Sequence, residues 1–216
     1  LRSGGLGGQL RQVVNIPARQ EFRELLKFYE ENLPRAGVQV LLNRAAAPED
    51  THGYDKVIVA TGGKPNRTVL PTAPDAIPVY TSRQVLTGEI MPGRRVVVIG
   101  GSYIGCFTAQ YLAREGAMSP EELFFSMTHH SDTMEHILDR LDHSDRSVVL
   151  LEQGKKIGLG FESGTSWPVL GELGRLGVPF LKNTLVTAIT ATGVDPTETK
   201  KARTYVTRHD DADGVV

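Results

Sequence analysis

Two runs of β-branched residues, each followed directly by glycines, are the most regular hydrophobic feature of the chain. One run covers residues 56–60 (KVIVA) and continues into TGG, and the other covers residues 95–99 (RVVVI) and continues into GGS. Apolar runs of this length and composition predict buried strands, and the glycines predict a tight turn after each. A shorter apolar run at residues 38–42 is a further strand candidate. We expect it and the run at 56–60 to be buried.

Helical patterns alternate with these strands. Residues 18–33 place five large apolar side chains on one helical face and charged side chains on the other, which predicts an amphipathic surface helix. Further helices are expected near residues 82–86, after the glycines at 100–105, and at 167–176, where Gly177 ends the pattern. Ser119 to Glu122 has the sequence of a capping box with proline at the first helical position, and an apolar stripe follows from Met134 to Leu141.

The order of these elements predicts the fold class. The β pattern returns at residues 147–151 and ends on Glu152, and from Phe180 onward the chain alternates like antiparallel strands, at 185–189 and 204–207. Strands that alternate with helices predict an α/β, Rossmann-like three-layer domain with a parallel sheet, here with an antiparallel β segment. We expect two domains, residues 1–92 and 93–216, with a helical insertion at about 118–146.

Composition narrows the class of protein. A length of 216 residues corresponds to about one and a half domains. A net charge of -1 argues against a nucleic-acid binder, and the absence of a long apolar run or a signal pattern favours a cytoplasmic protein without a membrane partner. The single cysteine, Cys106, excludes a CxxC redox pair and a four-cysteine cluster within the chain. Glycine is enriched, with 23 residues, and these glycines are clustered.

The turn after residues 95–99 is the strongest candidate site. In a dinucleotide fold, the first glycine of G-x-G-x-x-G permits the tight turn, the second admits the pyrophosphate and the third lets the helix pack on the strand. Gly100 and Gly105 hold the first and third places and Ser102 holds the second, with Gly101, Tyr103 and Ile104 between them. Strand, turn and helix follow one another as this fingerprint requires.

Glu152 is the expected acidic partner of that turn. The fingerprint needs a carboxylate at the end of the next strand, about 20 residues on, to accept from the ribose hydroxyls. Glu152 lies 47 positions beyond Gly105, and removal of the insertion at 118–146 restores the expected interval. A carboxylate there favours NAD(H) over NADP(H), because it repels a 2′-phosphate. The alternative is a glycine turn that only packs a helix on a sheet.

Other constellations are weaker. His129, His130, His136 and His143 recur near helical spacing, but Ser131-Asp132 breaks the helix and a solvated surface is the better interpretation than a metal site. Cys106 begins a helix, where its pKa could be lowered, although a small buried apolar role is favoured. A Tyr-xxx-Lys pair and a P-loop motif are both absent from the sequence, which excludes short-chain dehydrogenase and P-loop chemistry.

Taken in order, four segments resemble flavin oxidoreductases of the family that includes 2-enoate reductases, 2,4-dienoyl-CoA reductase and trimethylamine dehydrogenase. The segments are LGGQL at 6–10, YDKVIVATGGKP at 54–65, RRVVVIGGSYIG at 94–105 and IGLGFESGTSWPVLGELGRLGV at 157–178. The residues around EELFFSMTHHS resemble the insertion of a subset of enoate-reductase-like proteins. The resemblance covers essentially the whole chain, and Ser102 is its departure from the fingerprint.

The resemblance implies a partial FAD-type nucleotide-binding domain at residues 1–92, an NAD(P)-type Rossmann domain at residues 93–216, and a larger protein. FAD is expected at Gly7, Gly8 and Gln9 and at Ala60, Thr61 and Gly62, although either set alone is compatible with an ordinary turn. NAD(H) is expected at the turn from Gly100 to Gly105 and at Glu152. The first FAD-type fingerprint would precede residue 1, and FMN and a 4Fe-4S cluster would lie in a TIM-barrel domain outside this chain.

The expected function is therefore the nucleotide-binding portion of a flavin- and NADH-dependent enzyme that reduces activated C=C bonds. No residue of this chain is assigned to catalysis, and we expect the isolated chain to be inactive on the substrate. The alternative is a non-catalytic adenine-nucleotide-binding or scaffold domain of a multidomain flavoprotein. The expected partners are the nucleotides, the barrel domain and further copies of the chain in a homo-oligomer.

Overall fold

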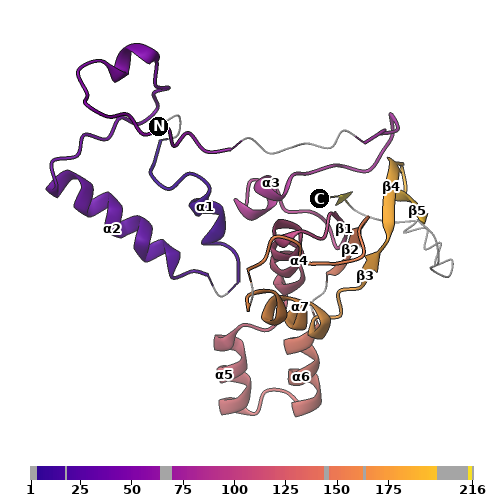
Figure 1. Ribbon diagram of the computed structural model, residues 1–216. Helices are drawn as coiled ribbons and strands as arrows, with labels where there is room; N and C mark the ends of the chain where they lie inside the picture. Colours follow the sequence, from indigo (N-terminus) through magenta and orange to yellow (C-terminus); the bar gives the residue numbers. More distant parts are fainter. Residues whose placement is uncertain are drawn as a thin grey trace. The chain divides into compact units, whose positions relative to one another are not determined.

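The computed structural model describes residues 4–17, 19–63, 70–143, 146–162, 164–198 and 214–215. The chain divides into two compact units, Leu1–Thr68 and Val69–Val216, and Figure 1 shows the elements of each. Residues 70–92 belong with the second unit, so this unit begins before the nucleotide-domain boundary predicted at 92–93. The division into two nucleotide-binding domains at this boundary stays a prediction.

The first unit is built from helices. It contains the short helix α1 (Leu10–Val13), the long helix α2 (Phe22–Arg35) and a single 3₁₀ turn, η1 (Pro48–Thr51). The predicted amphipathic helix is confirmed as α2, although it begins at residue 22 and none of its side chains is buried. The loop before α1 approaches α2 closely, because a side chain at Gly7 would collide with Leu26. An ion pair of 3.4 Å between Arg11 and Glu30 joins the same two helices.

The two strands predicted in the first unit are not formed. Residues 38–42 and 56–60 form no strand, and apart from the half-buried Val40 their side chains are exposed: Ile58 is 90% exposed and Val59 is 81% exposed. The prediction of buried strands is therefore wrong for this unit. The physical reason is that a strand makes its hydrogen bonds only to another strand, and no strand occurs among the described residues of this unit.

The second unit has a parallel sheet of four strands in the order β3-β2-β1-β6. Its elements are α3 (Ser82–Leu86), β1 (Arg95–Ile99), α4 (Tyr103–Arg114), α5 (Pro120–His129), α6 (Met134–Asp142), β2 (Ser147–Glu152), α7 (Ser166–Arg175), β3 (Phe180–Lys182), β4 (Thr184–Ile189), β5 (Val194–Glu198) and β6 (Gly214–Val215). The strands β1 and β2 pair in parallel along their length, with Arg95 opposite Ser147 and Ile99 opposite Leu151. This confirms the predicted Rossmann-like α/β fold.

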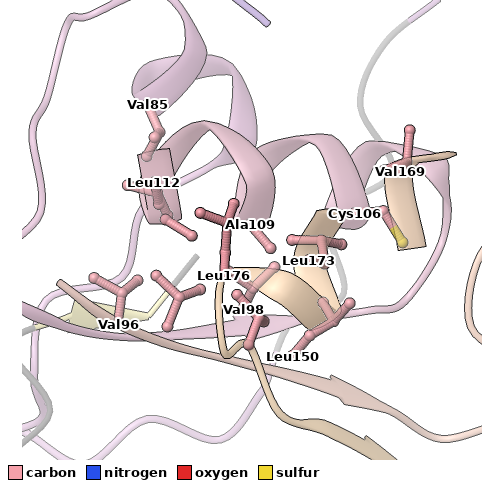
Figure 2. Close-up of a cluster of buried hydrophobic side chains, with 13 residues drawn as sticks. Val85, Val96, Val98, Cys106, Ala109, Leu112, Leu150, Val169, Leu173 and Leu176 are labelled. Atoms are coloured by element: carbon pink, nitrogen blue, oxygen red, sulfur yellow. The ribbon is translucent and has the colours of Figure 1, made fainter. Parts of the chain in front are cut away.

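One face of this sheet is covered by helices α3, α4 and α7. Alternate strand residues point to it, among them Val96, Val98 and Leu150, and all three are at most 2% exposed. Figure 2 shows how the side chains of α4 and α7 lie between the helices and the strands. Burial of each such valine or leucine side chain stabilises the fold by about 1.5–3 kcal/mol.

The opposite face is covered by an antiparallel β-hairpin rather than by helices. Strands β4 and β5 pair with each other, and Val186, Ile189 and Val194 pack with the strand residues Val97 and Val149. The predicted antiparallel segment is thus confirmed at residues 185–189. Two details differ: β3 runs parallel within the main sheet, whereas the sequence pattern suggested an antiparallel strand there, and the strand expected at 204–207 lies outside the described residues.

Helices α5 and α6 form a helical hairpin between α4 and β2, as expected for residues 118–146 (Figure 1). The predicted capping box is present, because Ser119 N–H donates to Glu122 over 2.8 Å and Glu122 N–H donates to the Ser119 hydroxyl over 3.1 Å. The break between the helices follows His129, as predicted. Ile137 is the only residue of α6 that is buried, so most of the hairpin surface faces solvent.

Candidate functional site

The turn between β1 and α4 has the shape that the glycine fingerprint predicts. Gly100 has a φ of +104°, which side-chain-bearing residues rarely adopt. A side chain at Gly105 would collide with the carbonyl oxygen of Gly100. The backbone therefore requires glycine at both positions: Gly100 for the turn, and Gly105 for the close approach of helix α4 to strand β1.

The first turn of α4 has backbone hydrogen-bond donors that find no acceptor inside the helix. Ser102 occupies the N-cap position with extended backbone, and its hydroxyl does not cap the helix. The N–H groups of Ile104 and Gly105 lie in the first turn of an α-helix and have no acceptor within it. These donors, together with the positive end of the helix dipole, are suited to an anion such as a phosphate.

Glu152 reaches this turn, as the sequence predicted. One carboxylate oxygen, Oε2, accepts from Gly101 N–H over 2.7 Å, and the other, Oε1, accepts from Gly154 N–H over 2.6 Å. The two residues Gly101 and Glu152 are 51 positions apart in sequence. The end of β2 therefore lies beside the glycine turn, although the helical hairpin separates the two in sequence. This agrees with the prediction that residues 118–146 are an insertion in the spacing.

A segment that the sequence analysis did not assign to the site holds the turn from the other side. Gly158 N–H donates to the Gly101 carbonyl over 2.6 Å, and Tyr103 N–H donates to the Leu159 carbonyl over 3.0 Å. Ser102 and Leu159 form an isolated parallel bridge. The signal for this segment was the IGLG sequence, because Gly158 and Gly160 both have positive φ.

Gly101 lies at the centre of these contacts. A side chain there would come within 2.6 Å of Ile157 Cδ1 and 2.9 Å of Glu152 Cβ. The fingerprint allows any residue at this position, so the sequence alone did not show why it is glycine. The structure gives the reason, because the residue is enclosed by the loop that follows β2.

Tyr103 and Ile104 are the exposed side chains of the turn, at 44% and 45%. The Tyr103 ring lies against Phe161 edge to face, with centroids 6.4 Å apart, and Phe161 in turn packs on Phe107. A side chain at Gly160 would come within 2.8 Å of the Tyr103 ring. The aromatic ring therefore borders the turn in a position fixed by the segment after β2.

The remaining predicted residues lie in the first unit. Gly7 and Gly8 both have positive φ, and Gly7 contacts Leu26, so its glycine has a packing reason. Gln9 is the N-cap residue of α1. Residues Ala60, Thr61 and Gly62 are exposed and lie outside any helix or strand, and Gly62 has a positive φ of +78°. Their assignment to a flavin nucleotide stays a prediction.

The favoured interpretation of Cys106 agrees with its environment. The thiol is fully buried, and this burial raises its pKa to about 11. A thiol with so high a pKa is a poor nucleophile at neutral pH. Its sulfur faces the carbonyl oxygen of Gly101 at 3.7 Å, so it packs beneath the turn as a small side chain.

Two histidines of the region around the helical hairpin pair with acidic neighbours on the surface. His136 contacts Asp132, and His143 contacts Asp139. Within the described ranges, no group of three or more His, Cys, Asp or Glu side chains is arranged to hold a metal ion. Among the same residues, no helix is both long enough and apolar enough to cross a membrane.

Comparison with known proteins points to one family. Residues 34–216 match the family described as pyridine nucleotide-disulphide oxidoreductase. A metal reductase of Desulforamulus reducens is 28% identical over 194 residues, which cover 87% of this chain and 29% of that protein. A bilirubin reductase of Mediterraneibacter gnavus is 30% identical over 88% of this chain and 25% of its own length.

A cinnamate reductase of Clostridium sporogenes is 37% identical over 117 residues, which cover 53% of this chain and 17% of that protein. The chain therefore spans less than a third of the length of each of these curated relatives.

Solved structures agree on the fold. The structure of a 2-naphthoyl-CoA reductase in complex with 2-naphthoyl-CoA matches 99% of this chain with a TM-score of 0.73 and 23% identity. A histamine dehydrogenase from Rhizobium sp. 4-9 matches the whole chain with a TM-score of 0.68 and 18% identity. In these two cases the match covers 28% and 30% of the solved chain, so the resemblance concerns one part of a longer protein.

Proposed function

The chain belongs to the pyridine nucleotide-disulphide oxidoreductase family, and from this premise we propose that its second unit binds NAD(H) at the turn between β1 and α4. The chain corresponds to the nucleotide-binding part of flavin oxidoreductases of the enoate reductase kind. In the proposed activity, NADH delivers reducing equivalents through flavin to a catalytic domain outside these 216 residues. The substrate class is a compound with an activated C=C bond, as in the enoate reductases.

The contact between Glu152 and the glycine turn is the observation that carries this proposal. A carboxylate beside the turn suits the two vicinal hydroxyls of an adenosine ribose, because an ionised carboxylate accepts hydrogen bonds at about four lone-pair positions. Two of these are used by Gly101 and Gly154, which leaves positions for the ribose. The same charge disfavours NADP(H), whose 2′-phosphate would lie against it.

The pyrophosphate would be held by the first turn of α4. Ile104 and Gly105 offer free backbone donors there, and the Ser102 hydroxyl, which does not cap the helix, offers a third. Gly105 lets these donors approach the strand closely. Once bound, the nicotinamide supplies hydride chemistry, whereas the residues of this chain bind and orient the nucleotide.

The flavin assignments belong to the same proposal. We place FAD at Gly7, Gly8, Gln9, Ala60, Thr61 and Gly62, on the resemblance of these segments to the family. FMN and a 4Fe-4S cluster would be carried by the barrel domain of the whole protein. The relatives are named as reductases of metal, cinnamate and bilirubin, so we expect members of this group to serve different acceptors.

A scaffold role is the alternative, and one observation favours it. Two backbone donors of the turn, those of Gly101 and Tyr103, are already paired with Glu152 and Leu159 of the protein itself. A turn whose donors are all used internally would pack a helix without binding a nucleotide. The free donors at Ile104 and Gly105 are the reason that we prefer the NAD(H) site.

Calorimetric titration of the 216-residue chain with NADH separates these two functions. We expect saturable binding of NADH, weaker binding of NADPH, and at least a tenfold loss of NADH affinity in Glu152→Ala, since a hydrogen bond to a charged group contributes about 1.5–3 kcal/mol. Glu89→Ala, which removes an exposed glutamate of a loop, is the matched control and should bind as the wild type does. No binding at millimolar NADH would favour the scaffold role.

A further inference from the structure

We propose that Glu152 is also a positioning residue, which fixes the glycine turn in its final shape before any nucleotide arrives. Its significance for NADH rests on the proposed function, but the clamp itself is a property of the nucleotide-free protein. A carboxylate at the end of β2 needs only one free oxygen to bind a ribose. Here both oxygens are engaged with backbone N–H groups, of Gly101 and Gly154, so the side chain joins two loops.

The geometry of the two hydrogen bonds is that of a bridge. Gly101 belongs to the turn after β1, and Gly154 belongs to the loop after β2, so each carboxylate oxygen holds a different loop. The distances of 2.7 Å and 2.6 Å lie at the short end of the range for N–H donors, as hydrogen bonds to ionised groups do. Glu152 thus links the carboxyl ends of the two central strands.

Gly101 is the residue on which this clamp acts. Its N–H is held by Glu152 and its carbonyl by Gly158 N–H at 2.6 Å, so the peptide groups on both sides of its Cα are fixed. Gly100 and Gly101 are adjacent glycines, which lose more conformational freedom on ordering than any other residue. Without the two contacts, this dipeptide would be the most variable part of the turn.

The consequence is preorganisation of the nucleotide site. Fixing a loop before a ligand binds lowers the entropic cost of binding, and the clamp uses lone pairs that the ribose does not need. The carboxylate therefore has two separate effects on affinity: it holds the turn that presents the donors of α4, and it accepts from the ribose. Truncation removes both, whereas a residue that only accepts from the ribose would affect the ligand alone.

Amide hydrogen exchange of the nucleotide-free chain, measured by NMR, tests the clamp without using a ligand. In Glu152→Ala we expect the Gly101 and Gly154 amides to exchange at least tenfold faster than in the wild type, while the amides of β1 keep their rates. In Glu152→Gln the carboxamide has one oxygen to offer and an NH₂ group in place of the other. One of the two glycine amides should therefore stay protected while its partner is released.

The outcomes separate the clamp from the proposed function. Wild-type exchange at both glycine amides in Glu152→Ala would overturn the clamp, even if NADH affinity falls. Release of both amides in Glu152→Ala together with no NADH binding by the wild type would support the clamp and overturn the nucleotide site. If Glu152→Ala does not fold, Glu152→Gln decides: unequal exchange of the two amides supports the clamp, and unchanged exchange at both contradicts it. Glu89→Ala again serves as the control.

Discussion

Two segments with nearly the same sequence pattern behave differently in the two units. Residues 56–63 (KVIVATGG) are exposed and form no strand, with Val59 81% exposed, whereas residues 95–102 (RVVVIGGS) begin with the central strand β1, in which Val98 is 1% exposed. The difference is the neighbour, because β1 is paired on both sides, by β2 and β6. A run of β-branched residues therefore favours a strand, but the strand forms only where the surrounding fold supplies a partner strand to pair with it.

Helices show the opposite behaviour. Helix α2 forms in the first unit although no side chain of it is buried, because backbone N–H groups in a helix donate to carbonyl groups only four residues earlier. Helix α5 carries its own capping box. The two units thus differ least in the elements whose hydrogen bonds are local and most in those whose hydrogen bonds join distant residues.

The largest test of the second unit is Gly105→Ala. The new methyl group would meet the Gly100 carbonyl oxygen, which belongs to the backbone and has no room to move without separating α4 from β1. We expect a loss of more than about 4 kcal/mol in the free energy of unfolding, in the range of severe core lesions. Urea denaturation followed by the fluorescence of Trp167, the single tryptophan, measures it.

The matched control is Gly171→Ala, at an exposed helical glycine of α7 with open space around it. Alanine is favoured over glycine in a helix, so this variant should be stabilised by roughly 0.5–1 kcal/mol. Equal effects of the two substitutions would contradict the close approach of helix and strand at Gly105.

The comparison between the two runs is tested directly by the same substitution in each. Val98→Ala removes buried methyl groups from β1 and should cost about 2 kcal/mol of unfolding free energy. Val59→Ala removes exposed groups and should change it by less than about 0.5 kcal/mol. Calorimetric melting of the 216-residue chain measures both. A comparable cost at Val59 would show that residues 56–60 are buried in solution, and would restore the strand that the sequence predicts.

The smallest expected effect concerns the helical hairpin, whose capping is local. The hydrogen bonds from the Ser119 backbone N–H and hydroxyl lower the pKa of Glu122 below its ordinary value of 4.5. This contribution to the helix is present above pH 4.5 and is lost as the pH falls through the lowered pKa. We expect the amide signals of Ser119 and Glu122 to shift on acidification, while those of β1 keep their positions.

Glu122→Gln is the control for this titration, because the carboxamide preserves a capping box but does not titrate. The amide shifts of Ser119 in that variant should be nearly independent of pH over the same range. An unchanged acid-dependent shift in Glu122→Gln would contradict this assignment and would point to another carboxylate of the hairpin region, such as Asp132, whose pKa is lowered first by the Thr133 N–H.

The same distinction explains how much the sequence could predict. The helices, the parallel strands β1 and β2 and the approach of Glu152 to the glycine turn follow from periodicity and from the fingerprint. The unformed strands of the first unit do not, since pairing depends on residues far away in the chain. The role of Gly101 was also hidden, because its neighbours Ile157 and Gly158 reach it only through the fold.

The helical hairpin α5–α6 lengthens the chain between the two strands that carry the site, and the site keeps its geometry. It follows α4 and precedes β2, so it lengthens the connection that enters β2 at its N-terminal end. The glycine turn lies at the other end of the strands, after β1. The entropic cost of closing a longer connection grows only logarithmically, by about 0.6 kcal/mol for each doubling of its length. A folded hairpin with its own caps costs less than a flexible loop would. The crossover therefore carries two additional helices at low cost, while Gly101 and Glu152 keep their contact.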